Sequence, residues 1–336
     1  AAGSPARCGS GRLRSPEGRG RIHGGPSPAA SGRFCGAHDP VPGDPATVPS
    51  GMSSVRRLLL IRGLGHSGTT ILDLALGAHP ELIGLGEAVR VLRQPGPGEE
   101  TRGPALLRGT LRHQRLCTCG CTAATCPVWG PMLAWLSEHD QLPLLDKVHR
   151  LLDAVAEREP GRSWVVESYQ DDLDLPLVAD PELEIRILHL TRDLRSWVHS
   201  RSREARRRGR WLPGLRPMLR WCRVNARQER LLKRSGHPVL HLGYEQLALQ
   251  PEQSLRRVCD WLEIPFSEQM LAPSRHSSSH ILSGNRMRFD PGRGSRIRYD
   301  AAWLQAGTNL ASLALLLPWV AALNRRLVYS EPAEGA

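Results

Sequence analysis

The sequence is poor in aromatic residues and lysine, and it contains no long apolar run. Aromatic side chains make up 5% of the 336 residues, and only two of the 45 basic residues are lysines. No window reaches the roughly 18 apolar residues of a membrane span. There is no Asn-x-Ser/Thr glycosylation site, and no secretory signal follows residue 1 or residue 52. These absences argue against a membrane span and predict a cytoplasmic enzyme.

The scarcity of aromatics also decides how the charge is interpreted. The net charge is +12, and a basic chain often binds nucleic acid. Proteins that bind single strands interleave basic residues with aromatic rings that stack on the bases, and no such pattern occurs here. We therefore expect no nucleic-acid partner. The basic charge suits a small, highly charged anion.

Residues 1–51 differ in composition from the rest of the chain. Glycine and proline occupy 19 of these 51 positions, and no hydrophobic period survives, so the segment cannot bury enough apolar surface to order itself. It is predicted to be a disordered or non-native extension. The remaining residues, from Met52 on, suffice for one core, and we expect a single domain over 52–330.

Short apolar runs alternate with longer helical periods after Met52. The runs predict strands at 55–61, 164–166, 185–190 and 239–242, with a further short strand just before Glu87. Helices are predicted at 69–76, 144–157, 195–208, 215–235, 251–262 and 302–323, and the apolar segment 310–323 is expected to be a buried helix. Such alternation predicts an α/β fold with a central parallel sheet flanked by helices.

The strongest motif is "LLLIRGLGHSGTT", residues 58–70. A buried strand leads through a glycine-rich turn directly into a helix, and Gly63 and Gly68 have the G-x-x-x-x-G spacing of a phosphate-binding loop. Main-chain N–H groups and the helix N-terminus then face an anion. Thr69 stands where nucleotide triphosphatases have lysine, so the cation is expected at His66, with Arg62 nearby.

A second strand ends in the polar turn of "ILHLTRDLRSWVHSR", residues 187–201. Ser200 follows Arg192 by eight residues, a little over two helical turns, so the two side chains are predicted to converge. A guanidinium and a hydroxyl together bind phosphate well, because the guanidinium presents a planar fork of donors.

With these residues in place, the chain resembles the sulfotransferases. "GLGHSGTT" is similar to their 5′-phosphosulfate loop and "RDLRSWVHS" to their 3′-phosphate motif, and "LHLGYEQLALQPEQSLRRVCDWLEIP" and "HILSGNRMR" extend the resemblance. The resemblance implies a P-loop three-layer fold and 3′-phosphoadenosine 5′-phosphosulfate (PAPS) as sulfuryl donor. The acceptor would be a hydroxyl of unknown class, and no metal would be required for the chemistry.

The resemblance also implies roles for individual residues. The segment "LGAHPELIGLGEAVRVL" is similar to the tyrosylprotein sulfotransferases, in which the Glu after Gly is the catalytic base, here Glu87. His66 would stabilise the leaving group. The donor's two ends would be held by the following residues: Gly65, His66, Ser67, Gly68, Thr69 and Thr70 at the 5′ end, and Arg192, Ser200, Asn285 and Arg288 at the 3′ end.

Three departures from the family pattern stand out. His66 replaces the commoner lysine or arginine before Ser-Gly-Thr, Leu194 replaces the usual proline after Arg-Asp, and Gln170 stands where the family usually has lysine. His66 and Gln170 keep alternatives open. A phosphoryl-transfer enzyme would need a metal-binding aspartate at a strand end, for which Asp171 and Asp172 are the candidates. A catalytically inactive nucleotide-binding module is the other alternative.

Four cysteines crowd into "CTCGCTAATC", inside a Gly- and Pro-rich insertion at about 93–129. Cys117, Cys119, Cys121 and Cys126 are spaced C-x-C-x-C-x4-C, which differs from the common C-x2-C zinc knuckle. Zinc binding and a structural pair of thiols both remain open, and no metal is assigned to the chemistry. The acceptor pocket is expected to come from this insertion and from 212–221.

Overall fold

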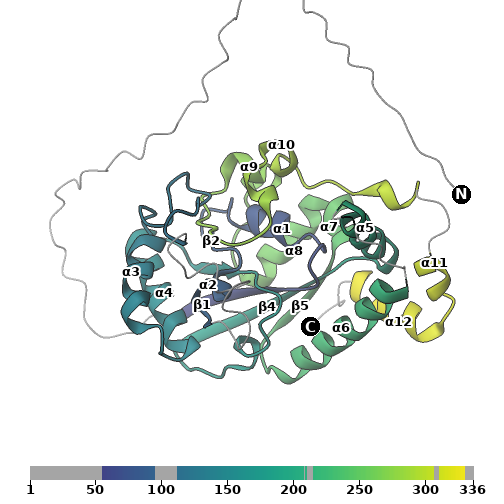
Figure 1. Ribbon diagram of the computed structural model, residues 1–336, viewed down its shortest axis with the longest axis horizontal. Helices are drawn as coiled ribbons and strands as arrows, with labels where there is room; N and C mark the ends of the chain where they lie inside the picture. Colours follow the sequence, from purple (N-terminus) through teal and green to yellow (C-terminus); the bar gives the residue numbers. More distant parts are fainter. Residues whose placement is uncertain (1–54, 95–111, 208, 210–214, 306–309, 330–336) are drawn as a thin grey trace, which may run out of the picture. The chain divides into compact units, whose positions relative to one another are not determined.

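The computed structural model describes residues 55–94, 112–207, 209, 215–305 and 310–329 (Figure 1). The extension predicted at 1–51 lies outside these residues, as do much of the predicted insertion and the first three residues of the predicted pocket segment 212–221. The statements below concern the described residues alone.

Five strands form one sheet in the part of the chain that the structure describes: β1 (Arg56–Arg62), β2 (Leu82–Gly84), β3 (Trp164–Glu167), β4 (Leu183–Thr191) and β5 (Val239–Gly243). Their order is β2-β3-β1-β4-β5, and every neighbouring pair is parallel. The predicted strands are confirmed within two residues at each end. The parallel sheet follows from the short, wholly apolar runs, which suit strands covered on both faces.

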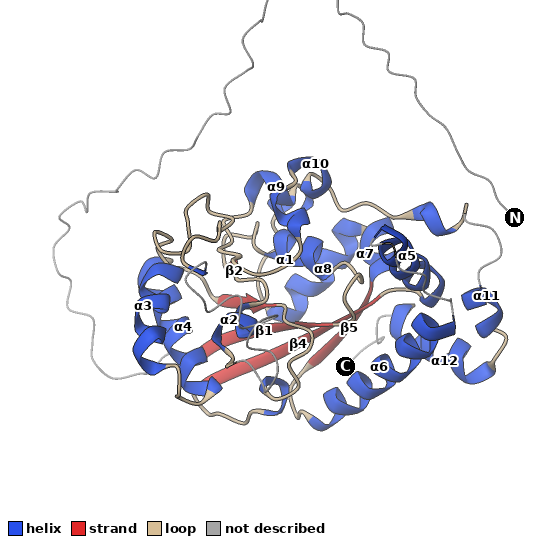
Figure 2. Ribbon diagram, viewed as in Figure 1, coloured by secondary structure: helices blue, strands red, loops and turns tan. Residues whose placement is uncertain are grey.

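Alternate residues of β1 pack into two separate cores. Leu58 and Leu60 lie in the core formed with α2 (Ala88–Leu92), α3 (Trp129–His139) and α4 (Leu144–Arg158). Leu59 and Ile61 face the opposite side, against α1 (Thr69–Leu76), α7 (Tyr244–Leu249) and α8 (Pro251–Leu262). The sheet is therefore the middle of three layers (Figure 2), and the predicted α/β fold class is confirmed.

A third core packs at the β5 side of the molecule. It joins α5 (Leu194–Arg207), α6 (Leu215–Arg234), α11 (Leu310–Ala314) and α12 (Pro318–Val328) around Trp197 and Trp221. The remaining elements are short: α9 (Pro273–His276), α10 (Pro291–Gly294) and four 3-10 turns at Leu175–Leu177, Glu268–Leu271, Arg286–Phe289 and Ala301–Trp303. Within the described residues, no helix combines the length and the apolar character needed to cross a bilayer.

The single buried helix predicted at 302–323 is wrong. The chain instead forms a 3-10 turn, then α11 and α12, and Leu317 between the helices is extended (φ −78°, ψ 117°). Proline disfavours the helical conformation in the residue before it, and Pro318 opens α12. Leu316, Leu317 and Trp319 are 77%, 45% and 58% exposed, so this stretch is not buried either.

Candidate functional site

The glycine-rich loop follows β1, the central strand, and has no room for side chains at two positions. A Cβ on Gly63 would lie 2.2 Å from the carbonyl oxygen of Leu190, and one on Gly68 would lie 2.6 Å from the ring of Tyr244. Gly68 also has a left-handed backbone (φ 96°), as has His66 (φ 76°). The loop is therefore pressed against the ends of β4 and β5, which only glycine permits.

The loop delivers its main chain directly into α1. Ser67 N donates to the carbonyl of Leu64 at 3.0 Å, and the helix begins with Leu72 N donating to Gly68 O at 3.1 Å. The N–H groups of Thr69 and Thr70 precede that bond, as at every helix start, and give this end its positive dipole. Gln170 reaches the same place, because its Nε2 donates to Thr69 Oγ1 at 2.9 Å.

Arg192 lies against this loop. Its Nη1 donates to the carbonyl oxygen of His66 at 3.2 Å, and its Nε donates to Ser196 Oγ at 2.6 Å. Nη2 pairs with Asp300 at 3.1 Å, and the guanidinium stacks 4.6 Å from the ring centroid of Tyr244. Burial would raise the pKa of Asp300, but the hydrogen bond and charge of Arg192 lower it below its ordinary value. The guanidinium is thus fixed on four sides.

Ser200 reaches the same loop residue, as the eight-residue spacing predicted. Its Oγ lies 3.5 Å from His66 Nδ1, while Arg201 Nη1 lies 3.0 Å from His66 Nε2. A guanidinium only donates, so Nε2 accepts and the ring carries its proton on Nδ1, facing Ser200. The cation expected at His66 is therefore supplied by Arg201 in this arrangement.

A cavity of 480 Å³ opens beside these residues. Its lining consists of His66, Ser200, Arg203, Glu204, Arg207, Asn285, Arg286 and Arg293. Four arginines and one glutamate make the cavity strongly basic, as an anion site requires. A larger hollow of 970 Å³ lies over α8 and touches none of the predicted site residues.

Asn285 and Arg288, the two residues of "GNRMR" that were predicted to bind the 3′ end of the donor, occupy different positions relative to the cavity. Asn285 lines the basic cavity, and its side chain accepts from Met287 N at 3.0 Å. Arg288 is not among the lining residues. Its guanidinium donates to the carbonyls of Leu282, Gly284 and Asn285 at 2.6–3.2 Å. Arg288 holds the segment together, and Arg286 takes its place at the cavity.

Glu87 follows the end of β2 and immediately precedes α2, without a side-chain capping bond. Its N–H donates to Ser283 O at 3.0 Å, and its Oε2 accepts from Arg90 at 2.8 Å and from Ser283 Oγ at 3.2 Å. The side chain is 21% exposed. The described residues place no hydrogen bond on its Oε1, and no described contact joins Glu87 to the glycine-rich loop.

One buried carboxyl near the glycine-rich loop, that of Asp73, was not predicted from the sequence. Asp73, on α1, is 1% exposed and accepts from Ser168 Oγ at 2.7 Å. Burial raises its pKa to about 7. The signal in the sequence was present, because Asp73 interrupts the apolar face of a helix one turn after Thr69.

Arg62, expected near the cation at His66, is not available to an anion. It is 2% exposed and pairs with Glu167 at 2.8 Å and with Asp172 at 3.3 Å. Burial raises the pKa of Glu167 to about 7, against the opposing charge of Arg62. Asp172 also accepts from Leu175 N at 3.2 Å, so this aspartate is committed to the interior and is not presented to a metal.

The Tyr-Glu pair at the start of α7 supports both motifs. Tyr244 packs between Gly68 and Arg192, and its hydroxyl donates to Arg298 O at 3.0 Å. Glu245 accepts from Asp193 N at 3.0 Å. Asp193 in turn accepts from Arg195 N at 2.8 Å, which caps α5. Burial alone would raise the pKa of Asp193, but Arg195 and Asn324 lower it.

Comparison with known proteins identifies a matching protein family. A model described as the sulfotransferase family matches residues 59–268. A search of curated proteins gave no match.

Three solved structures are similar over most of the chain. The sulfotransferase domain from the curacin biosynthetic pathway is 18% identical, with 82% of this chain and 99% of that chain covered and a TM-score of 0.44. The sulfotransferase domain from the Synechococcus PCC 7002 olefin synthase is 18% identical (84% and 98% covered, TM-score 0.48). Retinol dehydratase in complex with androsterone and the inactive cofactor PAP is 14% identical (83% of each chain covered, TM-score 0.34).

These three likenesses are too distant to place individual residues. The family match does not depend on them, because it spans more than half of the chain and includes the glycine-rich loop, the Arg192 turn and the Tyr244 helix. The chain belongs to the sulfotransferase family.

Proposed function

We propose that this protein transfers the sulfuryl group of PAPS to an acceptor hydroxyl. The observation that carries the proposal is the meeting of Arg192 and Ser200 at His66, beside a cavity lined by four arginines. The two motifs come from different strands, and a ligand with phosphate groups at both ends of an adenosine needs an anion site at each end. The family supplies the sulfuryl-transfer class.

The residues of the site fit such a donor. A Cβ at Gly63 or Gly68 would clash with Leu190 O or the Tyr244 ring, so both positions need glycine. A glycine-rich turn followed by a helix N-terminus offers main-chain N–H groups to a phosphosulfate. Ser200, Asn285 and the cavity arginines suit the 3′-phosphate. Arg192 is not among the lining residues, because its guanidinium is held by Ser196, His66 O and Asp300; we assign it to hold the loop at the edge of the cavity. Arg286 is the better candidate than Arg288, whose Nη1 and Nη2 already donate to carbonyls.

PAPS supplies an activated sulfuryl group when bound, and the chain supplies charge and proton handling. Glu87 holds its Oε2 on Arg90 and Ser283, so Oε1 is the atom we assign to accept the proton of the acceptor hydroxyl. We assign the loop N–H groups and His66 to stabilise negative charge at the leaving oxygen. Arg201 Nη1 lies 3.0 Å from His66 Nε2 and adds a positive charge beside that histidine.

The phosphoryl-transfer alternative loses one of its two candidate metal ligands in this structure. Asp172 is fully buried and pairs with Arg62, whereas Asp171 is exposed. Thr69 stands in place of the lysine. No specific observation favours this second function.

Transfer is tested directly with PAPS labelled in the sulfuryl group and a panel of acceptors: sugars, phenols, a tyrosine peptide and lipid hydroxyls. Label should move to at least one acceptor class. Glu87→Gln should reduce transfer by about 10²–10⁴-fold, the range for a general base, and should keep affinity for 3′-phosphoadenosine 5′-phosphate (PAP).

Glu184→Gln is the matched control. Glu184 lies near the start of β4, at the amino ends of the strands and away from the site, and pairs with Arg57 and Arg186. Its variant should transfer at the wild-type rate. An unchanged rate in Glu87→Gln would remove Glu87 from the role of base, and label that stays on PAPS with every acceptor class would count against the proposed transfer.

A further inference from the structure

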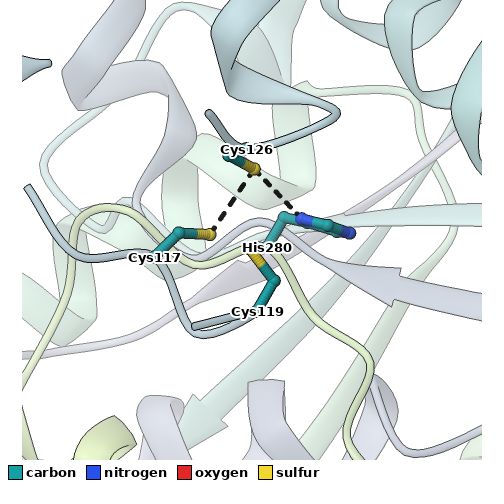
Figure 3. Close-up of side chains that lie close together, drawn as sticks. All are labelled: Cys117, Cys119, Cys126 and His280. Atoms are coloured by element: carbon teal, nitrogen blue, oxygen red, sulfur yellow. Dashed lines mark hydrogen bonds between the residues drawn. The ribbon is translucent and has the colours of Figure 1, made fainter. Parts of the chain in front are cut away.

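Three cysteines and one histidine meet at a point that the proposed sulfuryl transfer does not use. The ligand atoms of Cys117, Cys119, Cys126 and His280 all lie within 4.8 Å of one another. Figure 3 shows the four side chains turned toward a common centre. Cys119 is exposed and the other three are buried. We propose that these residues form a structural zinc site with three thiolates and one imidazole.

The distances within the group suit a tetrahedral ion. Cys117 Sγ and Cys126 Sγ are 3.7 Å apart, and Cys126 Sγ lies 3.2 Å from His280 Nδ1. Zinc bonds of about 2.3 Å to sulfur and 2.0–2.1 Å to nitrogen give a tetrahedron with edges of about 3.6–3.8 Å. The widest pair needs to close by only about 1 Å. A disulfide needs about 2.05 Å between the sulfurs, so Cys117 and Cys126 are not bonded.

His280 presents the correct nitrogen to the thiols. Its Nε2 lies 3.2 Å from Glu159 Oε1. A carboxylate only accepts hydrogen bonds, so the ring proton sits on Nε2 and Nδ1 carries a lone pair aimed at Cys126. A carboxylate behind a histidine is the usual outer support of a zinc-bound imidazole, fixing both the tautomer and the orientation.

Main-chain hydrogen bonds close the cysteine loop next to the buried Cys117 and Cys126. Cys117 N donates to Cys121 O at 2.9 Å and Gly120 N donates to Cys117 O at 3.0 Å, with Gly120 left-handed (φ 90°). Trp129 N donates to Cys126 Sγ at 3.5 Å, a contact that favours a thiolate. The indole of the same residue donates to His280 O at 2.6 Å.

Thr118 ties the two halves of the group together. Its Oγ1 donates to Ser279 O at 2.5 Å and accepts from Ile281 N at 2.8 Å. The loop that carries Cys117 and Cys119 is thus held on both sides of His280. These hydrogen bonds place the four ligand atoms together before an ion arrives.

The site is closed by four protein ligands, which is the pattern of a structural zinc and leaves no position for substrate. Its ion would join the cysteine loop to the segment that continues from His280 to Ser283, which contacts Glu87. The role is therefore to fix that segment against β2. This inference stands apart from the proposed transfer, because it needs no donor or acceptor.

The test is the zinc content of the full-length chain. The protein is expressed in zinc-supplemented medium, purified without chelators and then dialysed. We expect about one zinc per chain by mass spectrometry. Replacement by Co²⁺ should give the intense visible bands of a tetrahedral ion and the near-ultraviolet bands of thiolate ligation. Wild-type protein that keeps no stoichiometric zinc and shows no thiolate bands with Co²⁺ overturns the proposal.

Two single variants assign the ligands. Cys119→Ser changes an exposed ligand, so the chain should fold, yet its zinc affinity should fall at least about tenfold. Cys121→Ser is the matched control from the same loop, outside the group of four, and should keep the full metal content. Loss of zinc from Cys121→Ser with retention in Cys119→Ser would contradict the assigned ligand set.

Discussion

His66 combines a strained backbone with a crowded side chain. A non-glycine residue in the left-handed region costs on the order of 1–3 kcal/mol, and here the ring lies between Ser200 and Arg201 while the carbonyl accepts from Arg192. Those contacts hold the strained turn. The same residue therefore connects the loop of β1 to the helix after β4, and its nearest cation is an arginine.

Ser200 is the simplest test of the 3′ end of the cavity. Ser200→Ala removes one hydroxyl, and a hydrogen bond of about 0.5–1.5 kcal/mol predicts a PAP affinity about 2–13-fold lower with little change in stability. Ser202→Ala, on the same helix but outside the cavity lining, should bind PAP as wild type does. Calorimetric titration measures both, and equal affinities in the two variants would exclude Ser200 from the site.

Asp73 predicts a pH dependence of stability. Burial raises its pKa from 3.8 to about 7 in the folded chain. Between these values the folded state binds a proton that the unfolded state has released, so its contribution to stability is present at low pH and is lost as the pH rises through 7. Asp73→Asn cannot ionise and should escape that loss.

The free energy of unfolding of Asp73→Asn, minus that of wild type, should rise by on the order of 1–4 kcal/mol between pH 4 and pH 8. Urea unfolding followed by tryptophan fluorescence gives this difference. The contribution of Glu245 cancels in it, whereas Glu167 carries a charge that raises the pKa of Asp73 and contributes to the predicted difference. A difference that is constant with pH would show that Asp73 is already ionised when folded.

The glycine-rich loop is held by packing as well as by its own flexibility. Gly68 is both left-handed and in contact with Tyr244, whereas Gly161, in the turn before β3, is left-handed (φ 89°) with open space around it. Alanine variants of Gly68 and Gly161 therefore separate the free-energy cost of backbone strain, which both share, from the cost of a steric clash, which only Gly68 has.

Gly68→Ala should be less stable than Gly161→Ala by on the order of 1–3 kcal/mol and should lose PAP binding, because Tyr244 must move away from the loop. Gly161→Ala should bind PAP normally. Thermal unfolding and titration of both variants check this. Similar stabilities with intact binding in both would mean that the contact with Tyr244 is unimportant.

At the level of elements, the sequence predicted the strands well because each is a short apolar run between polar turns. The prediction of one buried helix at 302–323 was wrong, because the apolar composition of this segment did not indicate the break before Pro318 or the exposure of Leu316. It also could not find the fourth member of the cysteine group. His280 lies 154 residues from Cys126, and spacing within one loop carries no information about a distant segment.

On the scale of the whole molecule, the site lies at the carboxyl ends of the strands. These ends lie together because all five described strands are parallel. Each strand is followed by a predicted or observed site residue: the loop after β1, Glu87 after β2, Gln170 after β3, Arg192 after β4 and Tyr244 after β5. A ligand cleft is expected where the chain reverses its order, at β1. The motifs could be recognised in sequence, but the buried pairing of Arg62 and the occupied donors of Arg288 depend on tertiary contacts.

The central claim is that the site at these strand ends binds an adenosine with phosphates at both its 3′ and 5′ positions. Calorimetric titration of the wild-type chain with PAP, and separately with ATP and Mg²⁺, tests it most directly. We predict that PAP binds at least about 100-fold more tightly, a difference of about 2.7 kcal/mol, and that Arg192→Lys loses most of this preference. Tight, magnesium-dependent ATP binding with no measurable affinity for PAP would contradict the account.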